Sequence, residues 1–574
     1  MLDFLLLKKV QTEPKAKRQS AVSPNARNKN IAKLSLQFIF CDIIISRMGK
    51  IARYLNQLII GNVFDAPEIM ETYATDRSAL KIKPKLVALP ESTEDVRKIM
   101  RFCYQLASKG INMPVTVRGS GLDEGGADLG NSIVISTEKM NKLLEADRRE
   151  RLVRVQAGMT LRELNTALSV NGLTIPVGGR DNETIGGLIS NSPCDDFAGK
   201  YGGIMMYVER LEVVLANGEI LQTDRFPMRT VNKKAREKSL EGKIYARLPQ
   251  ILHTHKSLAD EIKKQGRSSY GYPAAASAIS RNNLDVMPVF FGAQGTLGII
   301  TEVILRAVPM ETRTARVVAT FREIENAVKF METVNGLKPR ELEIYDVRII
   351  KAAAETGKRL SAVTEDLESG YVIFARFDTR ARQSIKKLCK MQKNLPASTK
   401  LITESAKNST VLGEFENSLT NFLAQAKSGE RVPIMTDFYV PGANLKALVD
   451  DFKILENSLK LEMAIFGSYA SSNYSVRPKF KMNSKDFSKL ATTFLRTGAF
   501  IVKRQGGELT GGTPEGRVKA IVTNAEMGDE EKAFYTEIKD LFDRYNILNP
   551  DVKLGADTSY TVRHFRDDVI SPII

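Results

Sequence analysis

The apolar positions along the chain follow two spacings, one typical of strands and one typical of amphipathic helices. Strands are predicted where β-branched residues gather, at 115–118, 133–136 and 152–157. Residues 93–110 predict an amphipathic helix, because Ser92-Thr-Glu-Asp95 forms a capping-box pattern and Gly110 suits the C-terminal stop. Strands and helices mixed in this order indicate an α+β domain.

A second α+β domain is predicted to follow the first. Asn217-Gly218 between two apolar runs predicts a hairpin, and a helical insert rich in lysine and arginine follows at 223–286. Beyond Pro309, strands at 316–321 and 371–377 alternate with helices such as 324–334. The expected organisation is a disordered basic leader at 1–47, a helical segment at 48–79, two domains at 80–309 and 310–480, and a mostly helical C-terminal segment at 481–574.

The composition narrows the classes of function. The chain has 574 residues, with 84 Lys and Arg against 67 Asp and Glu, which gives a formal net charge of +17. Such a charge favours anionic substrates, nucleic acid or an anionic membrane surface, although charge that is spread along a chain also simply keeps it in solution. Four widely separated cysteines argue against a disulfide framework, a zinc ribbon and an iron–sulfur cluster. The longest apolar run, at 34–45, is too short to span a bilayer. We therefore expect a cytoplasmic protein, with peripheral association at the inner membrane face left open.

Three glycine-rich turns, each beside a predicted strand, are the strongest chemical signal in the sequence. They are Arg118-Gly-Ser-Gly-Leu-Asp-Glu-Gly-Gly126, Thr184-Ile-Gly-Gly-Leu-Ile-Ser-Asn191 and Gly292-Ala-Gln-Gly-Thr-Leu-Gly298. Glycine weakens regular structure unless a backbone or a ligand must come very close. One such turn alone would be ordinary, but three together predict loops that close on one extended ligand with phosphates.

In this order and spacing the turns resemble the PCMH-type FAD-binding domain of the vanillyl-alcohol oxidase superfamily, and most of all its D-lactate dehydrogenase and glycolate oxidase group. The resemblance covers most of Tyr73–Gly555. It implies an α+β fold, in which a PCMH-type FAD-binding domain precedes an α+β cap domain and a helical C-terminal segment that packs back on the FAD domain. It also implies that FAD contacts Arg118, Gly119, Ser120, Gly121, Leu122, Gly125, Gly126, Thr184, Gly186, Gly187, Asn191, Gly202, Gly298, Ile299 and Asn549.

The same resemblance implies that the FAD is not covalently attached. Relatives with covalent FAD use a histidine, and the histidines of this chain, at 253, 255 and 564, all lie outside the glycine turns. Cys103 and Cys194 are the alternatives for a thioether link. Cys103 falls on a predicted helix, where it is expected to be a small core residue.

The predicted cap domain departs from the family at its metal motif. The family pattern Gly-His-x-Gly-Asp-Gly-Asn-x-His, often followed by x-Arg-Pro, corresponds here to Gly467-Ser-Tyr-Ala-Ser-Ser-Asn-Tyr-Ser-Val-Arg-Pro478. Serines 468 and 475 replace both histidines, whereas Asn473 and Arg477 are kept. Since serine is a poor ligand for a zinc-type ion, we expect no catalytic metal.

A second family motif, which places an acid and a histidine near the flavin, is also changed. Gly512 and Thr513 stand at those two positions, so the usual histidine base is missing. A buried carboxylate with a raised pKa could replace it. The remaining ionisable groups near the motifs are Glu508, Glu515, Tyr469 and Tyr474. A planar guanidinium is well suited to bind a substrate carboxylate. Arg477 is the first candidate for this role, and Arg504 and Arg517 are weaker candidates. The predicted catalytic residues are therefore Arg477, Asn473 and Glu515.

The leading hypothesis is an FAD-dependent oxidoreductase that takes hydride from a CH–OH group, by family that of a 2-hydroxy acid such as D-lactate or glycolate. Electrons would pass on to oxygen, a quinone or a separate redox protein. The changed metal and histidine motifs favour, as an alternative, a substrate that is not a 2-hydroxy acid. A basic protein that binds nucleic acid or an anionic surface is the alternative from another class. It rests on net charge alone, and we expect no nucleic-acid partner because no recognition motif is present.

Overall fold

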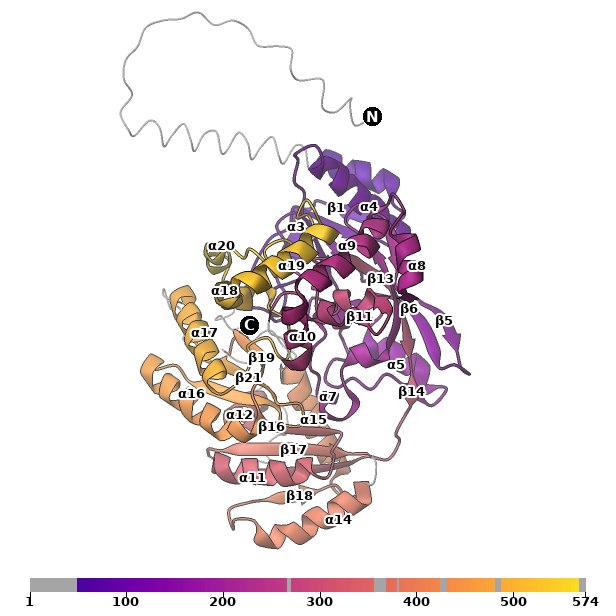
Figure 1. The fold of residues 1–574 in the computed structure, drawn as a ribbon. Coiled ribbons are helices and arrows are strands. Elements are labelled where there is room, and N and C mark those ends of the chain that lie inside the picture. Colours follow the sequence, from indigo (N-terminus) through magenta and orange to yellow (C-terminus); the bar gives the residue numbers. More distant parts are fainter. Residues whose placement is uncertain are drawn as a thin grey trace, which may run out of the picture. The chain divides into compact units, whose positions relative to one another are not determined.

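The computed structural model describes residues 49–265, 270–355, 368–378, 381–423, 431–480 and 487–566 (Figure 1). The predicted leader at 1–47 lies outside the described residues, and every element discussed below belongs to the compact unit that begins at Ala52. The segment predicted to be helical at 48–79 also contains a strand, β1 (Asn62–Phe64), which precedes helix α3 (Pro67–Thr72). This strand forms because its backbone pairs antiparallel with the edge of a neighbouring sheet, which outweighs local helix preference.

That neighbouring sheet carries the first glycine turn. Strands β2 (Leu86–Leu89), β4 (Ile133–Ser136) and β3 (Val115–Arg118) pair in parallel, and β1 adds to the edge of β2. Helix α4 (Thr93–Ala107) begins as predicted at Ser92, whose side chain accepts a hydrogen bond from the amide of Asp95. Cys103 is fully buried on this helix, which confirms its predicted place in the core.

A five-stranded antiparallel sheet carries the other two glycine turns. Its strand order is β5 (Leu143–Asp147), β6 (Leu152–Gln156), β13 (Ile299–Arg306), β8 (Val208–Val214) and β9 (Ile220–Gln222). Strands β8 and β9 form the predicted hairpin. The second glycine-rich stretch, predicted as a turn, is instead helix α6 (Ile185–Asn191), because the side chain of Thr184 caps it by accepting a hydrogen bond from the amide of Gly187. This helix packs on β13, which directly follows the third glycine turn.

The predicted basic insert is largely helical. It contains α8 (Met228–Lys234), α9 (Leu240–Thr254), α10 (Lys256–Gln265) and the 3-10 helix η2 (Pro273–Ser277). Short strands β10 (Arg225–Pro227), β11 (Ile279–Ser280) and β12 (Asn283–Asp285) close the insert on itself. Within the described ranges, no helix of the protein has the length and apolarity that crossing a bilayer requires.

A seven-stranded antiparallel sheet forms the second domain (Figure 1). In spatial order its strands are β18 (Leu401–Thr403), β15 (Ala315–Phe321), β17 (Tyr371–Phe377), β16 (Glu341–Asp346), β20 (Met463–Ser468), β21 (Asn473–Pro478) and β19 (Met435–Tyr439). Helices α11 (Ile324–Asn335), α12 (Val347–Glu355), α14 (Ala381–Met391), α15 (Ser409–Leu423) and α16 (Leu445–Leu459) pack against its strands or each other.

The C-terminal segment is mostly helical, as predicted, and returns to the first domain. It contains α17 (Phe487–Arg504), α18 (Gly516–Glu526), α19 (Asp529–Phe542) and α20 (Thr558–Arg563). Helix α19 packs on α9 of the insert. The amide of Val115 in β3 then donates to the carbonyl of Ile547 at 2.7 Å, and the amide of Asn549 donates to the carbonyl of Val115 at 2.8 Å. The chain therefore folds as the predicted α+β protein.

Candidate active site

The three glycine turns meet around one cavity of about 700 Å³, which we call the glycine cavity. Its wall includes Gly119, Ser120, Gly121, Leu122, Thr184, Gly186, Gly187, Asn191, Gly298 and Ile299. At Gly121 the backbone has a φ of 70°, and a Cβ there would lie 2.2 Å from Nη2 of Arg118. Only glycine meets both conditions, which explains its presence at the tightest point of the first turn.

The other residues predicted to contact FAD lie behind this wall or beside it. Nη2 of Arg118 donates to the carbonyl of Thr75 at 2.9 Å, and its guanidinium stacks over the ring of Tyr73. Asn549 donates to the carbonyls of Ala127 and Gln294, so it joins the first glycine turn to the third. Gly125 lines a neighbouring chamber, Gly126 packs on Leu80, and Gly202 ends the short helix α7 (Ala198–Tyr201).

The glycine cavity suits a ligand that carries phosphates, such as FAD. Among the described residues, no acceptor receives a hydrogen bond from the backbone amides of Gly119–Leu122, which all lie in residues that line the cavity. A run of free amides in a glycine turn binds phosphate oxygens. A Cβ at Gly295 would meet no atom nearer than 3.7 Å, so a side chain at this wall position would enter the cavity.

A smaller chamber of about 390 Å³ adjoins the glycine cavity, and we call it the charged chamber. The two spaces share Leu122, Asp123, Glu183 and Asn191 in their walls. The rest of the chamber wall is Glu124, Gly125, Arg180, Pro193, Thr436, Asp437, Thr513, Pro514 and Lys519. It therefore brings ionisable groups from both domains and from the C-terminal segment to the edge of the glycine cavity.

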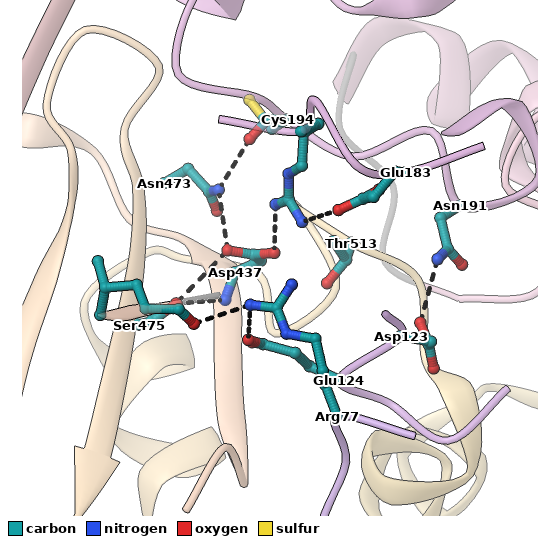
Figure 2. Close-up of polar contacts among 12 residues, drawn as sticks. Arg77, Asp123, Glu124, Glu183, Asn191, Cys194, Asp437, Asn473, Ser475 and Thr513 are labelled. Carbon is teal, nitrogen blue, oxygen red and sulfur yellow. Dashed lines mark hydrogen bonds and ion pairs between the residues drawn. The ribbon is translucent and has the colours of Figure 1, made fainter. Parts of the chain in front are cut away.

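Asp437 is the ionic centre of this chamber (Figure 2). Its Oδ2 accepts from Nη2 of Arg180 at 3.0 Å, while Nη1 of Arg180 donates to Glu183 at 3.1 Å. Burial raises the pKa of Asp437, but Arg180 and Lys519 outweigh it and hold this pKa below its usual value. Asp437 has a φ of 50° at an irregularity in the β19–β21 pairing. Such a strained position is typical of a residue that a site requires.

Lys519, on helix α18, is the cation of the chamber that forms no ion pair with any described residue. Its Nζ donates to the hydroxyl of Thr513 at 3.0 Å and to the carbonyl of the same residue at 3.2 Å. Burial lowers the pKa of Lys519 to about 8, against the opposing attraction of Asp437 and Asp123. A buried amine that is partly neutral near physiological pH can accept a proton.

The structure places the three predicted catalytic residues around the charged chamber rather than in its wall. Arg477 is buried and its Nη2 donates to Oε1 of Glu124 at 2.7 Å. Asn473 donates to the carbonyl of Cys194 at 3.1 Å and faces Asp437 at 3.5 Å (Figure 2). Glu515 accepts from Nζ of Lys553 at 2.5 Å and lines a separate cleft. Whether any of them touches the substrate stays a prediction.

Sequence reasoning missed Arg180, Asp437 and Lys519. They lie far apart along the chain, and none of them belongs to a motif that carried the family resemblance. A local signal for Arg180 existed, because it lies four residues before the second glycine turn. For Lys519 the pattern gave no signal, since a lysine on a helix is normally exposed.

Of the two serines at the family's histidine positions, Ser475 contacts the backbone of a neighbouring strand. The hydroxyl of Ser475 accepts from the amide of Asp437 at 2.9 Å, so it supports the irregular turn of β19. Ser468 is buried at the end of β20. In the part of the chain that the structure describes, no group of three His, Cys, Asp or Glu side chains is placed to bind a metal.

Comparison with known proteins agrees with this architecture. The model of a family described as "FAD binding domain" matches residues 84–224, and that of "FAD linked oxidases, C-terminal domain" matches residues 310–552. The chain is 24% identical over 498 residues to the D-2-hydroxyglutarate dehydrogenase of Pantoea ananatis, which covers 83% of this chain and 48% of that protein. The chain thus spans about half the length of this relative.

Two further relatives match along most of their length. The D-lactate dehydrogenase of Anaerostipes hadrus is 23% identical over 494 residues, which cover 84% of this chain and 92% of that one. The structure of p-cresol methylhydroxylase with bound substrate superposes with a TM-score of 0.61 at 14% identity, over 88% of this chain and 96% of that chain. Both family models describe parts of FAD-linked oxidoreductases. The chain is a flavoprotein of the PCMH or vanillyl-alcohol oxidase type with an FAD-linked oxidase C-terminal domain, distantly related to the D-2-hydroxyglutarate and D-lactate dehydrogenases.

Proposed function

We propose that the protein binds FAD non-covalently and oxidises the CH–OH group of a hydroxy acid in the charged chamber. The observation that carries this proposal is that the charged chamber, which is lined by Arg180 and Lys519, shares part of its wall with the glycine cavity. The relatives named D-lactate and D-2-hydroxyglutarate dehydrogenase support a 2-hydroxy acid.

The amides of Gly119–Leu122 are the groups that would hold the pyrophosphate of FAD. Asp123 supports this turn, because its Oδ2 accepts from the amides of Gly125 at 3.0 Å and Ala127 at 2.7 Å. Its Oδ1 accepts from Nδ2 of Asn191 at 3.0 Å, which links the turn to helix α6. When bound, FAD supplies a two-electron acceptor for hydride. We further propose that oxygen, a quinone or a separate redox protein reoxidises the reduced FAD.

Arg180 is the proposed anchor for the substrate carboxylate. A guanidinium has five N–H donors, and Glu183 and Asp437 engage only two of those of Arg180. These two acids also fix the plane of the guanidinium, which presents it to a carboxylate as a rigid fork. Arg477, the anchor predicted from the sequence, does not line the charged chamber and donates instead to Glu124 in its wall.

Lys519 is the proposed acceptor of the hydroxyl proton. Thr513, which stands at the family's histidine position, holds the Lys519 amine in the chamber through two hydrogen bonds. The lowered pKa leaves part of this amine neutral near pH 8, so it can take the proton as the CH–OH carbon loses hydride. Asp437 is less suited to this role because its pKa is lowered.

Anaerobic bleaching of the bound flavin by a panel of 2-hydroxy acids and neutral alcohols tests the function. Bleaching by at least one 2-hydroxy acid, and weaker bleaching by the matching alcohol without a carboxylate, is expected. An Arg180→Met variant should lose most of the preference for the acid while it keeps its FAD. Flavin that is bound but bleached equally well by neutral alcohols would rule out a carboxylate anchor and support the alternative substrate class.

A further inference from the structure

A third space, much larger than the charged chamber, opens beside it and has no role in the function proposed above. This outer cleft has a volume of about 1510 Å³ and lies between the insert, the η1 turn and the loop before α18. Its wall includes Met205, Met206, Ile262, Tyr270, Pro273, Ala274, Pro288 and Phe291. A small hydroxy acid bound at Arg180 and Lys519 would leave the outer cleft without a ligand.

The outer cleft and the charged chamber adjoin each other. Both are lined by Asn191, Pro193, Thr513 and Pro514. Thr513 is the residue that holds the amine of Lys519, and Asn191 also lines the glycine cavity. A molecule that has its polar end at Arg180 and Lys519 and also occupies the outer cleft would pass beside Thr513 and Pro514.

The charges of the outer cleft are largely satisfied within the protein. Nζ of Lys553 is 2.5 Å from Oε2 of Glu515, and the other carboxylate oxygen accepts from the amide of Gly271. Lys263, the third charged residue of the wall, lies 3.9 Å from Asp260 on its own helix. Because the buried charges are paired, the cleft offers an ionic ligand little, and its recognition depends on apolar contact.

The mouth of the outer cleft carries exposed, pliable apolar side chains. Met206 is 74% exposed and Met205 is 39% exposed, both on η1 (Ile204–Tyr207). Large apolar side chains that remain in water beside a cleft mark a surface that binds apolar groups. Methionine adapts to chains of different shape because its side chain is unbranched and flexible.

We infer that the substrate is a hydroxy acid with a large apolar substituent, whose carboxylate and CH–OH group lie in the charged chamber and whose apolar body fills the outer cleft. The inference rests on the proposed function and names its substrate class. It assigns Met205, Met206, Ala274 and Phe291 to the selection of the substrate rather than to its oxidation.

The chain-length dependence of anaerobic flavin reduction tests the inference. Lactate is compared with 2-hydroxy acids of increasing alkyl length and with an aryl member such as mandelate. Each methylene that enters the cleft should raise the efficiency of flavin reduction roughly fourfold, until the cleft is filled. Ala274→Phe, which places a ring in the cleft, should abolish this rise and leave lactate unchanged. Val170→Phe adds the same ring on an exposed turn outside the cleft, where Val170 is 85% exposed, and should change nothing.

A binding measurement separates this inference from the proposed oxidation. A fatty acid of matched length has no hydroxyl to oxidise, yet it should bind the FAD-loaded protein and shift the flavin absorbance. Its Kd should rise by about tenfold or more in Ala274→Phe, as expected for the loss of two or more buried methylenes. Met206→Gln, at an exposed position that tolerates polar groups, should weaken the same binding without disturbing the fold.

Two outcomes would overturn the inference, and a third would instead refute the proposed oxidation. Equal efficiency for short and long acids would refute it and leave the proposed function standing. Fatty acid binding with no bleaching by any hydroxy acid would support the apolar site and refute the proposed oxidation. If Ala274→Phe slowed reoxidation of reduced flavin by a quinone and changed no substrate, the cleft would be an electron-acceptor site, and the inference would be wrong.

Discussion

Nη2 of Arg477, on cap strand β21, donates to Oε1 of Glu124, in the first glycine turn, at 2.7 Å. Nη2 of Arg77 donates to the same oxygen at 3.0 Å, and both arginines also donate to the carbonyl of Leu423. The Arg477 side chain is 2% exposed and that of Glu124 is 16% exposed. This buried pair ties the cap sheet directly to the loop that lines the glycine cavity.

Arg477→Met should therefore act mainly on stability. Removal of one partner from a buried pair leaves a buried charge behind, and we expect a loss of about 2–4 kcal/mol, moderated because Arg77 still neutralises Glu124. Thermal unfolding of the FAD-loaded protein measures this loss. Arg504→Met is the matched control, since Arg504 is 51% exposed and its pair with Asp451 should contribute little. A variant with an unchanged melting temperature but a strongly raised KM for an anionic substrate would instead support the carboxylate anchor predicted from the sequence.

FAD should leave the denatured protein completely. The three histidines lie outside the residues that line the glycine cavity, and Cys103 is buried on α4, so none of these groups reaches the cavity wall. Cys194 lines the outer cleft rather than the glycine cavity. Acid precipitation should therefore release all the yellow colour into the supernatant. Flavin that remains in the pellet, and is still attached to a peptide after the pellet is digested, would point to a thioether at Cys194.

Gly121→Ala should weaken FAD binding far more than it weakens the fold. A methyl group there would strain a backbone with a φ of 70° and collide with the guanidinium of Arg118. Gly110→Ala is the matched control, because Gly110 has a similar φ of 79° and no atom within 4 Å of its Cβ position. Both variants should lose about 1–2 kcal/mol from the left-handed backbone. Only Gly121→Ala should also lose FAD in an equilibrium titration, and equal loss in both would contradict a specific role for the turn.

Removal of divalent metals should leave flavin reduction unchanged. Ser468 and Ser475 replace the two family histidines, and Ser475 is committed to the amide of Asp437. The comparison is anaerobic bleaching before and after prolonged chelation, with metal content determined on the same samples. Stoichiometric zinc or manganese whose loss stops bleaching would show that ligands outside the family pattern have been recruited.

The elements that the sequence predicted well are those whose cause is local. The capped helix after Ser92, the hairpin at Asn217-Gly218 and the first and third glycine turns depend on a few neighbouring residues, and the structure contains all of them. The second glycine-rich stretch forms helix α6 instead of a turn. The charged chamber depends on tertiary contacts instead. Arg180 meets Asp437 across 257 positions, and Arg477 meets Glu124 across 353, so no local pattern could show which arginine faces the cavity. Lys519 was missed because a lysine on a helix is normally exposed, and only its burial in the folded protein lowers its pKa.

Lys519 should impose an ascending pH dependence on the efficiency of flavin reduction. Burial lowers the pKa of its amine to about 8, and only the neutral amine accepts a proton. Efficiency should thus rise about tenfold per pH unit well below pH 8 and level off above it. Lys519→Met should abolish this rise with pH and slow flavin reduction roughly 100- to 10,000-fold, which is the usual contribution of a general base. If Lys519 only anchored the carboxylate, efficiency would fall as pH rises through 8.

The stability of the protein reports on the same amine without any substrate. The folded pKa lies near 8 and that of an unfolded lysine near about 10.4, so the unfolded chain binds more protons between these values. The contribution of this group to the free energy of unfolding should therefore rise with pH through that window and be constant outside it. Lys519→Met removes this contribution. The free energy of unfolding of both proteins is measured by denaturant titration at pH 7.5–10.5 in steps of about half a unit, and the difference between the two isolates the contribution of the amine. Lys503→Met is the matched control, because Lys503 is 42% exposed in its ion pair with Glu526. A pH-independent difference between wild type and Lys519→Met would show that the amine titrates normally, and would remove Lys519 as the proton acceptor.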